Sequence, residues 1–192
     1  MTVLSQHTSD VNSARAFESL KVRFQSWEQV QHAPDEELAD AIRSGGIANL
    51  KARRIKRILD AIEAREGGLD LARLAGLSDE DVDAYLRSLP GVGRKTSACV
   101  LLFSMGRAAF PVDTHVQRVA GRLGLVPEAA TADEVHEILG PRVPPELCYE
   151  FHIRLVRHGR DTCTARRPRC GACILFDLCD AGPRFVTSGE AR

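Results

Sequence analysis

Four of the six cysteines in this chain lie within 17 residues near its C-terminal end. The first ten residues carry no basic segment followed by an apolar run, so we expect no secretory signal and a reducing compartment. Clustered cysteines in that setting predict one metal centre rather than disulfides, and thiolates suit either zinc or an iron–sulfur cluster. The four follow the spacing Cys-x6-Cys-x2-Cys-x5-Cys and are Cys163, Cys170, Cys173 and Cys179.

The rest of the chain has helical periodicity. Apolar side chains recur three and four residues apart over residues 17–27, 38–42, 55–62 and 82–89, which predicts amphipathic helices. Residues 94–104 are apolar nearly all round after the first turn, which is typical of a buried helix. No segment alternates with the period of a strand. The sequence therefore predicts an all-α fold.

Several helix starts carry local signals. Ser78 precedes three acidic residues, and Thr131 with Glu134 forms a capping box. A Pro-Pro pair at 144–145 predicts the start of a helix over residues 146–157.

Composition excludes several classes of protein. Hydrophobic residues make up 44% and charged residues 27%, which is ordinary for a globular protein with a core. The longest apolar run, residues 98–103, is far short of the roughly 20 residues that cross a membrane. A shift in composition predicts two lobes, residues 1–107 and 108–192. Cys99 and Cys148 lie on apolar helix faces, where we expect them to be buried.

Charge is balanced in total but uneven along the chain. There are 26 basic and 26 acidic residues, so the formal net charge is zero. Residues 151–170 nevertheless hold six arginines against one aspartate, and a basic segment of this kind is either a phosphate-binding surface or a solvated face. Three of these arginines, Arg166, Arg167 and Arg169, lie inside the cysteine segment.

A glycine hairpin separates two predicted helices at residues 89–96. Gly91 and Gly93 allow a tight turn whose backbone amides, with the start of the next helix, favour an anion such as a DNA phosphate. The alternative is an ordinary corner between helices. Lys95 follows directly, in the first turn of a helix of buried type. The helix dipole and desolvation both favour its neutral amine, which is the form that a Schiff-base nucleophile needs, whereas a single lysine more often contacts phosphate or water.

Asp113 precedes a predicted helix over residues 114–122. Aspartate is a preferred N-cap, so the ordinary interpretation is structural. A carboxylate held rigid by a cap is also a good electrostatic partner for a cation.

Three segments occur in one order along the chain: LPGVGRKTS, then PVDTHVQRVAGRLGL, then HGRDTC with the remaining cysteines. This pattern resembles the endonuclease III family of DNA glycosylases with AP-lyase activity, from about Leu4 to Cys179. The resemblance implies a two-lobed helical fold: a six-helix lobe with a helix–hairpin–helix, shortened at its N-terminus relative to the family, and a lobe that holds a [4Fe-4S] cluster, which makes zinc the weaker alternative. It places the active site in a cleft between the lobes.

By position, the resemblance implies that Lys95 is the catalytic lysine and Asp113 the catalytic aspartate. It implies cluster ligation by the four clustered cysteines, and it places two residues near the wedge that fills the gap left by an extruded base. The DNA-binding residues implied in this way are His7, Ile47, Gly91, Gly93, Arg94, Arg166, Arg167 and Arg169. The family often has glutamine where His7 stands, so the lesion preference of this chain can differ.

The implied activity is excision of oxidised pyrimidines from double-stranded DNA through a Schiff base, followed by β-elimination at the abasic site. The implied protein is a monomer with no membrane partner, in the cytoplasm of a bacterium or archaeon and associated with the nucleoid. Two alternatives stay open. One is a monofunctional mismatch glycosylase, which usually lacks an amine at the position of Lys95. The other is a weakly active or non-catalytic iron–sulfur protein that only binds DNA.

Overall fold

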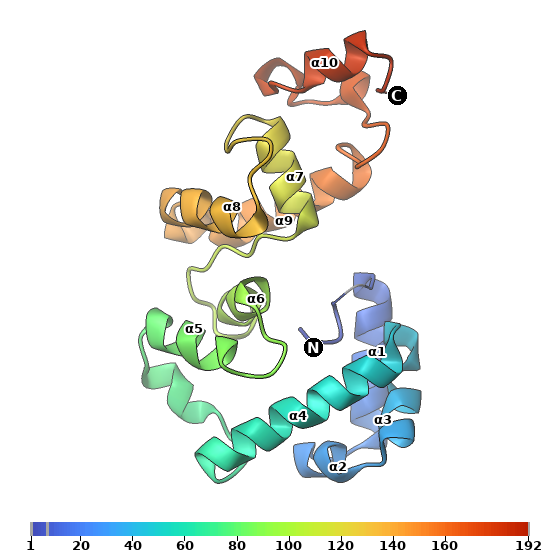
Figure 1. Ribbon diagram of the computed structural model, residues 1–192, viewed down its shortest axis with the longest axis vertical. Helices are drawn as coiled ribbons and strands as arrows, with labels where there is room; N and C mark the ends of the chain where they lie inside the picture. The colour runs from blue at the N-terminus through green and yellow to red at the C-terminus, as the bar shows by residue number, and fades with distance from the viewer. Residues whose placement is uncertain (1, 7, 192) are drawn as a thin grey trace. The chain divides into compact units, whose positions relative to one another are not determined.

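The computed structural model describes residues 2–6 and 8–191, and this part of the chain contains α-helices and short 3-10 helices without any strand. The predicted all-α fold is confirmed. In chain order the α-helices are α1 (Asp10–Arg23), α2 (Trp27–His32), α3 (Asp35–Ala41), α4 (Ala48–Glu66), α5 (Asp79–Arg87), α6 (Arg94–Ser104), α7 (Thr114–Arg122), α8 (Ala132–Leu139), α9 (Cys148–Asp161) and α10 (Gly182–Thr187) (Figure 1). The 3-10 helices are η1 (Arg43–Gly45), η2 (Ala72–Gly76), η3 (Gly140–Arg142), η4 (Pro145–Leu147), η5 (Cys170–Ala172) and η6 (Phe176–Leu178).

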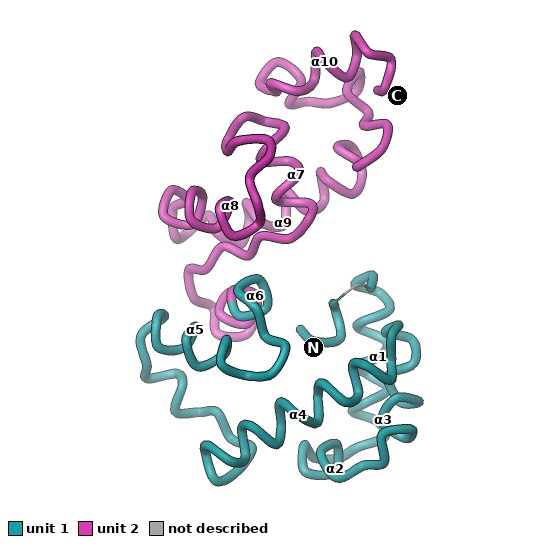
Figure 2. Tube along the Cα trace, viewed as in Figure 1, with its two compact units in different colours: residues 1–97 teal, residues 98–192 magenta. Residues whose placement is uncertain are grey.

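The chain divides into two compact units, residues 1–97 and 98–192, which Figure 2 colours separately. This boundary falls inside the continuous helix α6. The division into lobes 1–107 and 108–192 stays a prediction, because a contact boundary within one helix does not say where a lobe ends. Among the described helices, none is both long and apolar enough to cross a membrane.

Side-chain caps start several helices where the sequence predicts them. The Ser78 hydroxyl accepts from the Asp81 amide at 3.1 Å, so α5 begins at Asp79. Thr131 and Glu134 form the complete capping box that starts α8. These starts are local, because each cap and its amide lie within three residues of each other.

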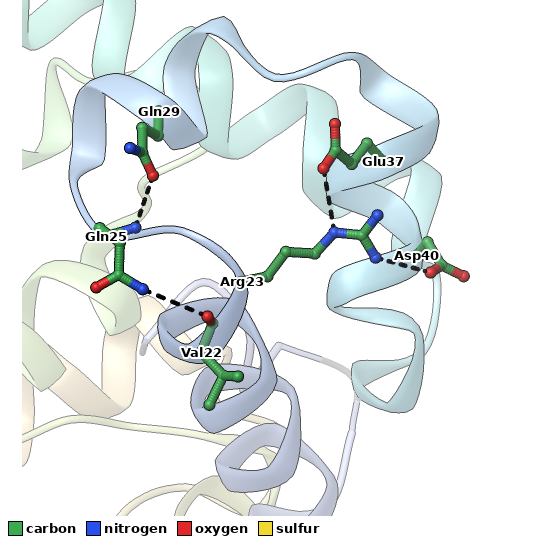
Figure 3. A network of polar contacts seen from close by, with 6 residues as sticks. All are labelled: Val22, Arg23, Gln25, Gln29, Glu37 and Asp40. Carbon is green, nitrogen blue, oxygen red and sulfur yellow. Dashed lines mark hydrogen bonds and ion pairs between the residues drawn. The ribbon is translucent and has the colours of Figure 1, made fainter.

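The predicted helix over residues 17–27 is two helices in the structure. α1 ends at Arg23, and Ser26 caps a new helix by accepting from the Gln29 amide at 3.3 Å. Arg23 ties the end of α1 to α3, because its guanidinium donates to Glu37 and Asp40, each at 3.1 Å (Figure 3). Periodicity alone missed this break, since the apolar spacing continues across the corner.

The helix predicted over residues 146–157 begins two residues later. Pro144 and Pro145 open a single turn of 3-10 helix, η4, before α9 starts at Cys148.

The core of the first unit forms where α4 packs against α2 and α3 (Figure 1). Its buried side chains include Leu20, Val30, Leu38, Ile42, Ala52, Ile55 and Leu59. Lys51 is buried in the same unit at 3% exposure, and its amine donates to the carbonyl oxygens of Leu4 at 2.8 Å and Gly45 at 2.6 Å. The first bond holds the N-terminal segment against α4, and the second holds the end of η1.

In the second unit α7 packs against α8 and α9. The buried side chains include Val112, Val116, Val119, Val135, Leu139 and Leu155. Gly159 lets α9 approach α7 closely, because a Cβ at this position would lie 2.9 Å from the Cβ of His115. The close crossing puts the end of α9, and therefore the start of the cysteine segment, beside α7.

Candidate active site and cluster loop

The glycine hairpin is a tight turn between α5 and α6. The Val92 amide donates to the Leu89 carbonyl at 3.1 Å, and Gly91 has φ +73°, which L side chains rarely adopt. A Cβ on Gly91 would also lie 2.6 Å from Nε of Arg54, so the arginine side chain packs directly against this glycine. A Cβ on Gly93 would meet nothing within 4 Å. The backbone conformation therefore favours glycine at Gly91, whereas the backbone at Gly93 has open space beside it.

Lys95 is the second residue of α6, as the sequence predicts. The helix starts at Arg94, and the Ser97 amide donates to the Gly93 carbonyl at 3.0 Å. Lys95 is partly buried, and no described residue forms a hydrogen bond or an ion pair with its amine. Lys95 thus lies at the helix start, and no carboxylate of the described residues pairs with its amine.

The sequence analysis missed a polar network next to Lys95. The Gln6 amide nitrogen donates to the Thr96 hydroxyl at 3.2 Å, and Nη1 of Arg54 donates to the Gln6 amide oxygen at 2.5 Å. The network links the N-terminal segment, α4 and the first turn of α6. No local pattern could have shown it, because Gln6 and Thr96 are 90 residues apart.

The two predicted wedge positions fare differently. His7 lies outside the described residues. Ile47 precedes α4 with φ 48° and ψ 40°, and its side chain is 54% exposed. A β-branched residue is rare in this left-handed region, and strain of this kind is found at functional positions more often than elsewhere.

Asp113 is the N-cap of α7. Its Oδ1 accepts from the His115 amide at 2.9 Å and from the Val116 amide at 2.8 Å. Both bonds use the same oxygen, so Oδ2 has no hydrogen-bond donor among the described residues. The expected capping role is confirmed, and the cap leaves one carboxylate oxygen available. Lys95 belongs to the first compact unit and Asp113 to the second, so each residue is described within its own unit.

The arginine segment is an exposed loop with a defined backbone. Arg166, Arg167 and Arg169 are exposed, whereas Pro168 between them is buried. The Thr164 hydroxyl donates to the carbonyls of Arg166 at 2.9 Å and Arg167 at 3.2 Å. These bonds hold the loop while the guanidinium groups reach solvent.

The four clustered cysteines line one cavity. Burial raises the pKa of the Cys170 thiol above its ordinary value, and the charges of the other three sulfurs raise it further. Four thiolates gathered in this way need a cationic group between them, so the donor set fits an iron–sulfur cluster, which gives each thiolate an iron of its own. Within the described residues, no three His, Cys, Asp or Glu side chains lie close enough to hold one metal ion. Cys99 and Cys148 are buried elsewhere, as expected.

Two arginines of α7 that the sequence analysis missed bind the cysteine loop. Arg118 donates to the carbonyls of Gly159 at 2.8 Å and Cys163 at 3.0 Å. Arg122 donates to the Cys163 sulfur at 3.4 Å and to the carbonyls of Thr164 at 2.8 Å and Ala165 at 3.0 Å. The only signal in the sequence is their spacing of one helical turn, which places both on one side of α7.

Comparisons with known proteins agree with this fold and with these motifs. Residues 1–145 match the model of the HhH-GPD superfamily of base excision DNA repair proteins, and residues 163–179 match the iron–sulfur binding domain of endonuclease III. The second match begins and ends on the first and last of the four clustered cysteines. A [4Fe-4S] cluster is therefore the cofactor of this chain.

The chain is also similar to individual proteins. It is 42% identical over 158 residues to an Arabidopsis thaliana protein named as a DNA glycosylase, with 82% of this chain and 54% of that protein covered. It is 35% identical to endonuclease III of Thermotoga maritima, with 93% of this chain and 79% of that enzyme covered. A solved structure of a trapped covalent intermediate of endonuclease III with DNA superposes with a TM-score of 0.82 at 33% identity, over 96% of this chain and 82% of that one.

The helical fold, the glycine hairpin and the four-cysteine loop define a base-excision repair protein of the HhH-GPD superfamily. Within that superfamily, the chain belongs to the endonuclease III family of DNA glycosylases with AP-lyase activity. It spans about four-fifths of the Thermotoga maritima enzyme but about half of the Arabidopsis thaliana protein.

Proposed function

We propose that this chain removes oxidised pyrimidines from double-stranded DNA and cuts the strand at the resulting abasic site, with Lys95 as the nucleophile. The observation that carries the proposal is the place of Lys95: a partly buried amine in the first turn of α6, directly after the hairpin, with no ion-pair partner among the described residues. Binding to DNA alone would not need an amine in this position, and a monofunctional glycosylase would not use one.

The reaction begins when the damaged nucleotide leaves the base stack, because C1′ is inaccessible inside a duplex. The lone pair of the Lys95 amine forms a bond to C1′, and the bond between C1′ and the base nitrogen breaks with its electron pair leaving on the base, which takes up a proton. The amine loses its protons as the sugar ring opens, and an imine to C1′ results. Loss of a C2′ proton then breaks the C3′–O bond, which cuts the strand 3′ to the lesion. Water finally hydrolyses the imine and frees Lys95.

In this proposal the Asp113 carboxylate stabilises the positive charge that develops on the sugar and on the amine, and it assists proton transfer. Its geometry supports the role, because Oδ1 is occupied by two backbone amides while Oδ2 is available. A carboxylate fixed before the reaction pays no reorganisation cost when the charge appears.

The DNA-binding role rests on three surfaces. The hairpin amides at Gly91 and Gly93, with Arg94, would bind a phosphate on one side of the lesion. The exposed Arg166, Arg167 and Arg169 would bind phosphates elsewhere on the duplex. Ile47, with His7, would fill the space left by the extruded base.

The cluster would be held by the thiolates of the four clustered cysteines. When bound, it supplies a structural tie that holds the arginine loop in one shape. The partner is double-stranded DNA with damaged bases or abasic sites. In this proposal the protein acts as a monomer on chromosomal DNA in the cytoplasm.

The test replaces Lys95 by alanine and measures borohydride trapping on a duplex with an abasic site. Lys95→Ala should abolish the trapped protein–DNA complex while the Kd for the same duplex stays unchanged. Lys21→Ala, an exposed lysine of α1 paired with Glu18, is the matched control and should trap like the wild type. Trapping by Lys95→Ala would show that another amine is the nucleophile.

A second experiment identifies the substrate class by measuring strand cleavage with purified protein. Four duplexes are compared, which carry thymine glycol, 5-hydroxycytosine, an abasic site, or adenine opposite 8-oxoguanine. We expect strand cleavage of the first three. Cleavage only after alkali, and only of the mismatch, would establish the monofunctional alternative. Binding without any cleavage would establish the non-catalytic one.

A further inference from the structure

The segment directly before Asp113 is buried, and one of its peptide groups is hydrogen-bonded at both its carbonyl and its amide. Phe110, Pro111 and Val112 are all buried, whereas Asp113 is partly exposed. The carbonyl oxygen of Pro111 lies 2.9 Å from Nδ1 of His152, and the amide nitrogen of Val112 lies 3.2 Å from Nε2 of His136. These two atoms belong to the same peptide unit. Two histidines therefore clamp the plane of the peptide between Pro111 and Val112.

Both histidines are themselves held in place. His136 comes from α8 and His152 from α9, and they are 8% and 5% exposed. The ring of His152 packs edge-on against Phe103 at 5.7 Å and Phe110 at 6.4 Å between centroids. The two rings thus approach the peptide from two different helices, and neither can turn away without disturbing the core.

The contacts also set which ring nitrogen carries a proton. The Val112 N–H is a donor, so Nε2 of His136 must offer its lone pair. The Pro111 carbonyl is an acceptor, so Nδ1 of His152 must carry a hydrogen. One ring acts as acceptor and the other as donor, and only together do they satisfy both polar groups of the buried peptide.

We propose that His136 and His152 are positioning residues for the carboxylate of Asp113. The clamped peptide fixes the backbone that enters Asp113, and the start of α7 fixes the backbone that leaves it. With Oδ1 already bound to two amides, the direction of Oδ2 is then determined. The inference rests on the proposed role of Asp113 in the reaction. Nothing in the motif around Asp113 shows it, because the histidines lie 24 and 41 residues further along the chain.

The test uses pairs of substitutions of similar size, one with a side-chain amide and one without. His136→Gln keeps an acceptor near the position of Nε2, and His136→Met removes it. His152→Asn keeps a donor near the position of Nδ1, and His152→Leu removes it. Val156→Ala, in the same core but not at the clamped peptide, controls for a general loss of packing. Thermal unfolding and the visible absorbance of the cluster check that each variant folds.

The first measurement is the rate of strand cleavage in a single turnover at saturating abasic duplex, together with the Kd. His136→Met and His152→Leu should be about ten- to a hundredfold slower with an unchanged Kd, because a small misplacement of a reacting group has effects of this size. His136→Gln and His152→Asn should recover most of the rate, and Val156→Ala should cleave at the wild-type rate.

The second measurement does not depend on activity. Amide hydrogen exchange of His115 and Val116 reports the cap made by Asp113, and it should become roughly tenfold faster in His136→Met and His152→Leu but not in Val156→Ala. Wild-type cleavage rates in the Met and Leu variants, or unchanged exchange of these two amides, would overturn the inference. If the wild type cleaves no substrate, the proposed function fails. The amide exchange of His115 and Val116 then tests by itself whether the two histidines position Asp113. If His136→Met does not fold, the two variants at His152 decide it.

Discussion

Ile47 combines backbone strain with an exposed apolar side chain. Its φ of 48° is one of two positive values for non-glycine residues in the described part of the chain, the other being at Arg167. Such a conformation costs on the order of 1–3 kcal/mol, and burial of the side chain does not repay it, because the side chain is 54% exposed. A wedge that inserts into DNA would explain why isoleucine stands here.

Ile47→Asn should therefore make the protein more stable and its binding to DNA weaker. Asparagine tolerates the left-handed region, so the free energy of unfolding should rise by about 1 kcal/mol. Loss of the apolar side chain should raise the Kd for an abasic duplex roughly tenfold. Urea unfolding and fluorescence anisotropy measure the two effects. Val22→Asn, at an exposed position inside α1, is the control and should neither raise the free energy of unfolding nor weaken DNA binding. A folded Ile47→Asn variant with wild-type affinity would show that Ile47 is not part of the wedge.

Lys51 is a buried cation whose amine binds two carbonyls. Burial lowers its pKa below the ordinary value of 10.5, and nearby Arg54 lowers it further. Between the lowered folded-state pKa and 10.5 the unfolded chain binds more protons than the folded one, so the stability that depends on Lys51 rises with pH through this window.

Lys51→Met should reduce the free energy of unfolding by about 1–3 kcal/mol at neutral pH, because the carbonyls of Leu4 and Gly45 lose their donor. The deficit relative to the wild type should grow as pH rises from the lowered folded-state pKa toward 10.5, since only the wild type loses a buried charge in this range. Denaturant unfolding at several pH values tests this. A deficit that shrinks with pH would contradict the assignment, and Lys21→Met should show no comparable deficit.

Helix α7 joins the proposed catalytic carboxylate to the cluster loop. Asp113 caps its first turn, and Arg118 and Arg122 reach from its later turns to the backbone around the first cysteine. Arg122 also lies over the ring of Phe185 at 4.5 Å, which ties in the segment after the last cysteine. One helix thus connects the two chemical features of the second unit.

Arg122→Met should leave the fold intact but weaken the hold on the cluster. Three hydrogen bonds to the loop disappear, including the one to the Cys163 sulfur. We expect the visible absorbance of the purified protein to decay several-fold faster in air or with an iron chelator, because bonds around metal ligands contribute about ten- to a hundredfold to metal retention. Arg154→Met is the control, because Arg154 is exposed and forms an ion pair with Glu150 on the surface of α9. Equal decay in the two variants would place Arg122 outside the support of the cluster.

Over the full chain the positive and negative charges cancel, so the position of the arginines matters more for DNA binding than the net charge. The formal net charge is zero, yet three exposed arginines stand on one short loop whose backbone is held by Thr164 and, through α7, by Arg122. Binding to DNA would then depend on local phosphate contacts and not on the overall charge.

Replacing Arg166, Arg167 and Arg169 together by serine should weaken binding and reduce its dependence on salt. The slope of log Kobs against log salt is negative, and each lost phosphate contact reduces its magnitude by about 0.9. We therefore expect the magnitude to fall by roughly 2 to 3 in the triple variant. Anisotropy titrations at several salt concentrations give the slope. Arg154→Ser should leave it unchanged, and an unchanged slope in the triple variant would show that the loop does not contact phosphates.

The sequence alone determined the helical class, the starts of α5, α6, α7 and α8, the cysteine segment and the candidate pair Lys95 and Asp113. Each depends on residues that are near one another in the chain: a cap and its amide, a hairpin glycine and its turn, a cysteine and the next cysteine. Periodicity missed the break after Arg23, and the Pro-Pro signal placed the start of α9 two residues early, because one turn of 3-10 helix comes first.

Tertiary structure alone decided which side chains support those residues. The contacts of Gln6 with Thr96, of Arg122 with the cysteine loop, and of His136 and His152 with the peptide before Asp113 join segments that are 24 to 90 residues apart. No spacing rule reports such contacts, because they exist only after helices from distant parts of the chain have packed. A buried peptide group then takes whichever donor and acceptor the packing brings to it.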